Sequence, residues 1–105
     1  MSFNMSARKS VLKQQYRTSM GILSEILQII MDGGIGGVIV SEISRKANLS
    51  HNATVESCQK LINACLIKSD RKGRNCIFVV TTKGIEFFQE FRRFQEIVQE
   101  MNLRY

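Results

Sequence analysis

Four polar side chains between residues 52 and 60 could contact the edges of DNA bases. The amides of Asn52 and Gln59 can each pair with adenine, and Lys60 can reach a guanine or a phosphate. Glu56 lies between them and would repel phosphates, unless it accepts a hydrogen bond from a cytosine amino group. These residue types predict a surface that enters the major groove of double-stranded DNA.

A helix must position these side chains. Ser50 follows Asn48-Leu49 and can cap the first helical turn, and His51 lies beside it, where backbone N–H groups also favour a phosphate. Apolar residues recur at helical spacing on what should be the opposite side: Thr54, Val55, Cys58, Leu61, Ile62 and Cys65. A solvated face of an ordinary core helix would look the same, so the neighbouring segments are needed to distinguish the two interpretations.

A second, shorter helix is expected just before this one, at about residues 42–47. Ser41 is expected to cap it, and Arg45 and Lys46 lie on its outer side, where they could contact phosphates. The residues expected to face the core are Ile43 and Ala47. With the turn at Asn48-Leu49, the stretch from Ser41 to Ile67 forms a predicted helix-turn-helix.

The next segment, IKSDRKGRNCIFVVT at 67–81, is predicted to form a β-hairpin with arms at 67–70 and 76–81. Gly73 provides the turn in the connection. Three cations lie in this connection: Arg71, Lys72 and Arg74. A charged hairpin tip can simply keep a sheet edge soluble. Directly after a helix-turn-helix, it is better explained as the wing of a winged helix, placed against phosphates or in a minor groove.

The charge of the chain is concentrated on the same region. Residues 41–83 carry eight Lys or Arg and three acidic residues, and so hold +5 of the net charge of +6. Residues 1–40 hold +2 and residues 84–105 hold −1. A basic excess confined to one region is typical of proteins that bind polyanions. If five or six of these cations contact phosphates, log affinity should fall with log salt with a slope of about −5.

Catalytic and metal-binding chemistry is not predicted. The chain has one His, and its three cysteines, Cys58, Cys65 and Cys76, lack C-x-x-C spacing and are expected to be reduced thiols in the core. The glycines of GGIGG at 33–37 follow a helix and precede a short strand at 38–40, whereas a phosphate-binding loop follows a strand and opens a helix. We therefore expect neither an enzyme nor a cofactor.

Helices are predicted at both ends of this core. One runs from about residue 14 to 32 and ends at Gly33-Gly34. The other runs from about 82 to 102 after a cap at Thr81-Thr82, with Ile85 and Phe88 packed on the core. Six further residues follow heptad spacing: Phe87, Phe91, Phe94, Val98, Met101 and Tyr105. This seam predicts a homodimer, although it could instead fold back on the first helix.

The resulting organisation is a basic tail at 1–13, a winged-helix domain at 14–84 and a dimerisation helix at 85–105. The fold class is mainly α with a small β-hairpin (α+β). The hydrophobic content of 44% in 105 residues supports one small folded domain. No signal peptide and no apolar run of membrane-spanning length is visible, which indicates an intracellular, soluble protein. With the predicted DNA binding, the expected location is cytoplasmic and nucleoid-associated.

The chain resembles a family of small archaeal winged-helix predicted transcriptional regulators, related to dimeric archaeal chromatin proteins with a long C-terminal helix. The resemblance covers about residues 16–105. The matching pieces are Tyr16-Arg17, Met20, Ala47-Asn48-Leu49-Ser50, Leu66-Ile67, Val80-Thr81, Gly84, and Arg93-Phe94 through Asn102-Leu103. It implies a winged-helix fold, DNA binding and a homodimer. This chain departs from the family at Cys65, where glycine is usual, and at Ala53, Thr54 and Ser57, where larger apolar or aromatic residues are common.

The leading hypothesis is a sequence-specific, double-stranded DNA-binding transcriptional regulator that acts as a homodimer. An architectural or chromatin protein would use the same fold without recognising bases. A winged helix used as a protein-interaction module would instead place Glu56 in a protein-binding surface. The operator and any small-molecule effector are not specified by the sequence.

Overall fold

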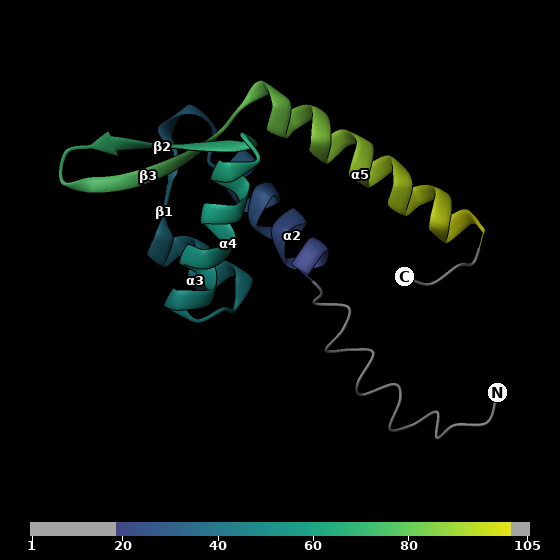
Figure 1. Cartoon of the computed structure of the whole chain (residues 1–105), viewed down its shortest axis with the longest axis horizontal. Helices are drawn as coiled ribbons and strands as arrows, with labels where there is room; N and C mark the ends of the chain where they lie inside the picture. Colours follow the sequence, from purple (N-terminus) through teal and green to yellow (C-terminus); the bar gives the residue numbers. More distant parts are fainter. Residues whose placement is uncertain (1–18, 102–105) are drawn as a thin grey trace, which may run out of the picture.

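The computed structural model describes residues 19–101; the predicted tail at 1–13, the beginning of the first predicted helix at 14–18 and Tyr105 lie outside the described residues. The elements in chain order are α2 (Ser19–Asp32), the 3-10 helix η1 (Gly34–Gly36), β1 (Val38–Ile39), α3 (Val40–Ala47), α4 (His51–Asn63), β2 (Ile67–Lys72), β3 (Asn75–Val80) and α5 (Thr82–Glu100). Helices α2, α3 and α4 lie beside a small sheet, and α5 extends away from them, on the opposite side from the β2–β3 hairpin (Figure 1). The expected fold class is confirmed.

The core lies between the three helices and one face of the sheet. Ile26, Leu27 and Ile30 of α2 are fully buried and form its centre. They pack with buried residues from every neighbouring element: Val38, Ile43, Ala47, Cys58, Leu61, Leu66, Ile67, Phe78 and Phe88. The apolar stripe of the first predicted helix therefore faces inward, as its 3.6-residue spacing requires.

The sheet has the strand order β1-β3-β2, and both pairs are antiparallel. Val38 pairs with Phe78, and Ile67 pairs with Val80. Val38, Phe78 and Ile67 all belong to the buried core, so they mark the face of the sheet that packs on the helices. Since side chains alternate along a strand, every second residue of the hairpin lies on this face.

The beginning of α3 differs from the prediction. The strand before it ends at Ile39 instead of continuing through Val40, which is already helical. Ser41 therefore lies inside the first turn and is not the cap. Ile39 occupies the cap position with extended dihedral angles and without a side-chain hydrogen bond. The physical reason is packing: Val40 is half-buried against the core from its helical position.

The hairpin is longer than predicted, because Arg71, Lys72 and Asn75 belong to its strands. Lys72 pairs with Asn75, which leaves a two-residue turn of Gly73 and Arg74. Gly73 has φ +65°, which suits glycine at the first position of a type II′ turn. Exposed charged side chains do not oppose strand pairing, so the ladder continues to the turn.

Thr81 joins α5 to the rest of the fold. Its hydroxyl accepts a hydrogen bond from the backbone N–H of Gly84 at 3.0 Å and donates to the carbonyl of Cys65 at 2.7 Å. Gly84 is required for close packing here, because a Cβ atom would collide with the carbonyl oxygen of Leu66. Phe88 is buried as expected, whereas the prediction for Ile85 was wrong: it is 37% exposed and does not belong to the core.

Candidate nucleic-acid interface

Thr54 is one of three buried residues that set the rotation of α4 about its axis, and its hydroxyl joins α4 to α3. The hydroxyl accepts a hydrogen bond from the Ser44 hydroxyl of α3 at 2.9 Å and donates to the carbonyl of Ser50 at 2.8 Å. The Ser50 side chain caps the helix by accepting from the N–H of Ala53 at 3.1 Å, as predicted. Between the helices, Asn48 adopts the left-handed conformation with φ +55°. These contacts define the helix-turn-helix geometry.

Thr54 is directed inward. On the other side of α4, two consecutive residues in each helical turn face solvent. The exposed residues are His51, Asn52, Val55, Glu56, Gln59, Lys60 and Asn63, and we call them the α4 stripe. The predicted polar face is therefore exposed as a continuous surface. Val55 is 44% exposed within it and not on the apolar side, which corrects the sequence assignment. Its wheel position is marginal, and its exposure depends on the rotation set by the buried residues Thr54, Cys58 and Leu61.

Two amides of the α4 stripe are bonded to each other. The Gln59 side chain donates to the Asn63 side-chain oxygen at 3.0 Å, one helical turn away. This bond orients the Gln59 amide along the helix surface. The support that Asn63 gives to Gln59 could not be deduced without coordinates.

The two basic residues of α3 have different surroundings. Lys46 forms an ion pair with Glu42 at 2.9 Å, and this hydrogen bond and the ammonium charge lower the pKa of the Glu42 carboxyl. Arg45 lines a shallow surface hollow of about 480 Å³ together with Asn48 and His51. The structure therefore brings Arg45 and His51 together at the turn, while part of the Lys46 charge is compensated.

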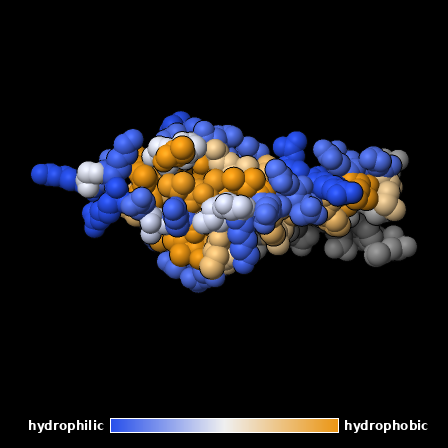
Figure 2. All heavy atoms as spheres, turned by 90° about the horizontal axis from the view of Figure 1, so that it is seen from above, coloured by the Kyte–Doolittle hydropathy of each residue, from blue (hydrophilic) through white to orange (hydrophobic). Residues whose placement is uncertain are grey.

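The cations of the hairpin lie on different sides of it. Arg71 pairs with Cys76 and shares the face of Phe78, which packs on the helices, whereas Lys72 lies on the reverse face. A Cβ atom on Gly36 of η1 would lie 4.0 Å from the Lys72 ammonium, so this ammonium lies over η1. Arg74 is exposed in the turn. The hydrophilic end of the hairpin projects beyond the body of the protein (Figure 2).

The cysteines only partly match expectation. Cys58 is 1% exposed, and burial raises the pKa of its thiol to about 11. Cys65 and Cys76 are exposed, so their assignment to the core was wrong. Cys65 has φ +63°, a left-handed conformation that turns its side chain out of the helical pattern.

Within residues 19–101, no group of three or more His, Cys, Asp or Glu residues could hold a metal ion.

The predicted seam of α5 is exposed in part. Phe87 and Phe91 are half-buried and stacked, with ring centroids 6.2 Å apart. Phe94 and Met101 are 52% and 61% exposed, whereas Val98 is 5% exposed. Ile97, which the heptad did not include, is 46% exposed.

No helix of the described segment is long and apolar enough to cross a membrane.

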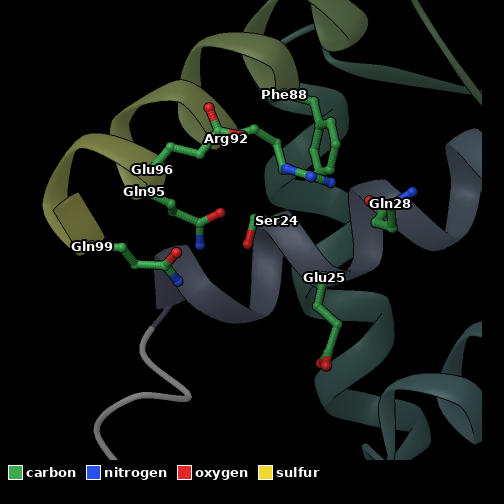
Figure 3. Close-up of a pocket in the computed structure, with 8 residues that line it drawn as sticks. All are labelled: Ser24, Glu25, Gln28, Phe88, Arg92, Gln95, Glu96 and Gln99. Atoms are coloured by element: carbon green, nitrogen blue, oxygen red, sulfur yellow. The ribbon is translucent and has the colours of Figure 1, made fainter.

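A second hollow, of about 460 Å³, lies between α2 and α5 (Figure 3). Its walls include Ser24, Gln28, Phe88 and Arg92, and the Arg92 guanidinium carbon lies 5.8 Å from the centroid of the Phe88 ring. Glu25 points away from α5 (Figure 3). Phe88 belongs to the buried core and Phe87 packs against it, so both attach α5 to the rest of the fold.

A helix-turn-helix followed by a β-hairpin, with a short strand completing the sheet, defines the winged-helix class of DNA-binding regulator folds. The sequence profile described as "Winged helix-turn-helix" matches residues 16–99, and the chain belongs to this family. No curated protein matches the sequence.

Solved structures with the same fold include several bacterial and archaeal proteins. AF1382 from Archaeoglobus fulgidus is 26% identical, with a TM-score of 0.63 over 72% of this chain and 86% of its own. YusO from Bacillus subtilis is 18% identical, with a TM-score of 0.72 over 94% and 75%. A mutant of MepR from S. aureus, bound to an oligodeoxyribonucleotide, is 17% identical, with a TM-score of 0.68 over 95% and 83%.

Proposed function

We propose that this protein is a sequence-specific regulator of transcription that binds double-stranded DNA as a homodimer. The observation that carries this proposal is the α4 stripe, an exposed row of side chains on a helix that the buried Thr54 anchors to α3. A helix held in this way can enter a major groove without reorganisation. The fold of a DNA-bound MepR mutant supports the same use. This role would place the protein on the chromosome in the cytoplasm.

The residues divide into base and phosphate contacts. On the α4 stripe, Asn52 and Gln59 would pair with adenine, Lys60 with guanine or a phosphate, and Glu56 with a cytosine amino group. Phosphate contacts fix the register of the protein on the duplex. We assign them to Arg45, Lys46, Ser50, His51, Arg71, Lys72 and Arg74, with Arg71 and Arg74 expected to contribute more than Lys72.

We infer that α5 joins two copies of the chain. Phe94, Ile97 and Met101 recur at intervals of three and four residues and are about half exposed or more. Apolar side chains repeated along one side of a projecting helix favour pairing with a second helix. In this proposal residues 14–84 bind DNA and residues 85–105 form the dimer, so two half-sites are contacted about one helical turn, or a multiple of it, apart.

Selection of binding sites from a random duplex library tests this function. We expect one consensus with two half-sites, and the selected duplex should remain bound in an excess of random DNA. The double variant Asn52→Ala/Gln59→Ala should lose this preference but retain weak binding to any duplex, because phosphate contacts are kept. Binding without a consensus would instead identify an architectural protein. Absence of binding at low salt would favour a protein-interaction module.

A further inference from the structure

Val55 is a large apolar side chain in the middle of the α4 stripe. It lies three residues after Asn52, next to Glu56, and four residues before Gln59, so it is adjacent on the helix surface to residues we assign to base contacts. Val55 is 44% exposed. The apolar residues that follow it at helical spacing, Cys58 and Leu61, are each only 1% exposed. Val55 thus contributes little to the core.

Helix stability does not explain a valine at this position. A β-branched residue loses side-chain freedom in a helix, and an exposed alanine, lysine or glutamate would stabilise α4 more. The same stiffness is useful in recognition, because valine in a helix is held almost entirely in one χ1 rotamer. Its two methyl groups are therefore presented to a ligand in one orientation, with little entropy left to lose on binding.

The chemistry that fits this side chain in a major groove is a methyl group. Thymine is the base that carries one there, at C5, and small apolar side chains recognise it by contact. Amides next to Val55 select adenine, and a carboxylate selects cytosine, but neither distinguishes thymine by its methyl group. We propose that Val55 recognises the 5-methyl group of a thymine in each half-site. This inference rests on the proposed DNA-binding function.

The orientation of Val55 depends on the same buried anchor as the rest of the stripe. Thr54 is 0% exposed and is bonded to Ser44 of α3, and the next residue along a helix is rotated by about 100°. Val55 is therefore held outward by its neighbour. The proposal needs no movement of the helix, and it makes Val55 a specificity-determining residue that the sequence pattern had placed in the core.

The test removes the methyl group from the DNA and from the protein in turn. Each thymine of the selected consensus is replaced singly by deoxyuridine, which leaves base pairing intact, and affinity is measured by fluorescence anisotropy at fixed salt. For the wild-type protein we expect a loss of about fourfold at one thymine per half-site, the effect of one methyl group returned to water. Because the homodimer carries the substitution in both copies, Val55→Ala should weaken binding to the thymine duplex by about the square of this factor, roughly 16-fold. The variant should be insensitive to uracil at that position.

Ile85→Ala is the matched control, since it also shortens an exposed apolar side chain but on α5, outside the α4 stripe. It should respond to uracil as the wild-type protein does. Equal responses of wild-type protein and Val55→Ala at every thymine, or a consensus without thymine, would overturn the role of Val55 while leaving sequence-specific binding established. Failure to select any consensus would overturn the proposed function, and this inference with it.

Discussion

A single hydroxyl group, that of Thr54, connects the two helices of the helix-turn-helix. The group is buried, accepts from Ser44 and donates to the Ser50 carbonyl, so both of its hydrogen-bonding capacities are used inside the protein. A buried hydroxyl is favourable only while its partners are present. The exposure of the α4 stripe therefore depends on a residue that contacts no DNA in our account.

Replacing Thr54 with valine keeps the shape of the side chain but removes its hydroxyl. We expect Thr54→Val to lower the free energy of unfolding by about 1–2 kcal/mol, because Ser44 loses its partner. Urea denaturation measures this change. Val55→Ala, at the neighbouring exposed position, should change stability by less than about 0.5 kcal/mol. Similar effects of the two substitutions would argue against the anchoring role of Thr54.

Cys65 adopts a conformation that glycine would adopt without strain. Its φ is +63°, whereas Ala64 before it has φ −86°. We expect Cys65→Gly to stabilise the protein by about 1 kcal/mol, because a left-handed residue with a side chain is strained. Ala64→Gly should destabilise it, since glycine gains only unfolded-state freedom there. Equal effects in thermal or urea unfolding would contradict the strain at Cys65.

The three thiols should differ in reactivity. Burial raises the pKa of Cys58 to about 11, so at pH 8 we expect two thiols to react rapidly with an aromatic disulfide reagent and Cys58 only on unfolding. Cys65→Ser/Cys76→Ser should lack the rapid phase. Because the folded pKa lies above the unfolded one, the contribution of Cys58 to stability is complete below about pH 9 and is lost towards pH 11. Three rapid thiols would contradict its burial.

In the β2–β3 hairpin, the pairing of the two strands decides on which face each cation lies. Alternation along β2 places Arg71 on the face that packs on the helices and Lys72 on the reverse face, over η1. The sequence showed three neighbouring cations but not that they lie on different faces of the hairpin. The face on which each cation lies depends on where strand pairing ends and the turn begins. A connection of five residues was predicted, whereas the structure has a turn of two.

Single substitutions in the hairpin should therefore have unequal effects on DNA binding. Arg71→Ala is expected to reduce affinity about five- to tenfold for each half-site at moderate salt, the loss of a phosphate contact worth about 1–1.4 kcal/mol. Lys72→Ala removes the same charge from the reverse face and should reduce affinity less than twofold. Anisotropy titrations of one duplex measure both. A larger effect of Lys72→Ala would show that the opposite face of the hairpin contacts DNA.

Most elements could be predicted from periodicity, because the core is built from strictly spaced apolar residues such as Ile26, Leu27 and Ile30. The caps at Ser50 and Thr81 were also predictable, since a side-chain oxygen before a helix has few other uses. Val55, Cys65 and Ile85 were misplaced for one reason. Each lies at the margin of an apolar stripe, where a small rotation or a left-handed residue decides its exposure, and such rotations depend on tertiary contacts.

At the scale of the whole molecule, α5 projects from the winged helix with part of its apolar side uncovered. We expect the protein to be a dimer with twice the 12.0 kDa mass of one chain. Phe94→Glu should give a monomer in multi-angle light scattering, because a charge would be buried in the seam. Ile85→Glu, outside the predicted seam, should remain dimeric. A monomeric wild-type protein, or a dimeric Phe94→Glu variant, would contradict this assembly.

The central claim is that the α4 stripe and the hairpin cations of this fold bind double-stranded DNA through its phosphates and bases together. The most direct measurement is the affinity of the wild-type protein for a selected duplex as a function of salt concentration. With Arg45, Lys60, Arg71 and Arg74 on phosphates and part of the Lys46 charge compensated, we expect a log–log slope of about −4 for each protomer, and so about −7 to −8 for the dimer on two half-sites. An affinity that does not change with salt would contradict the account.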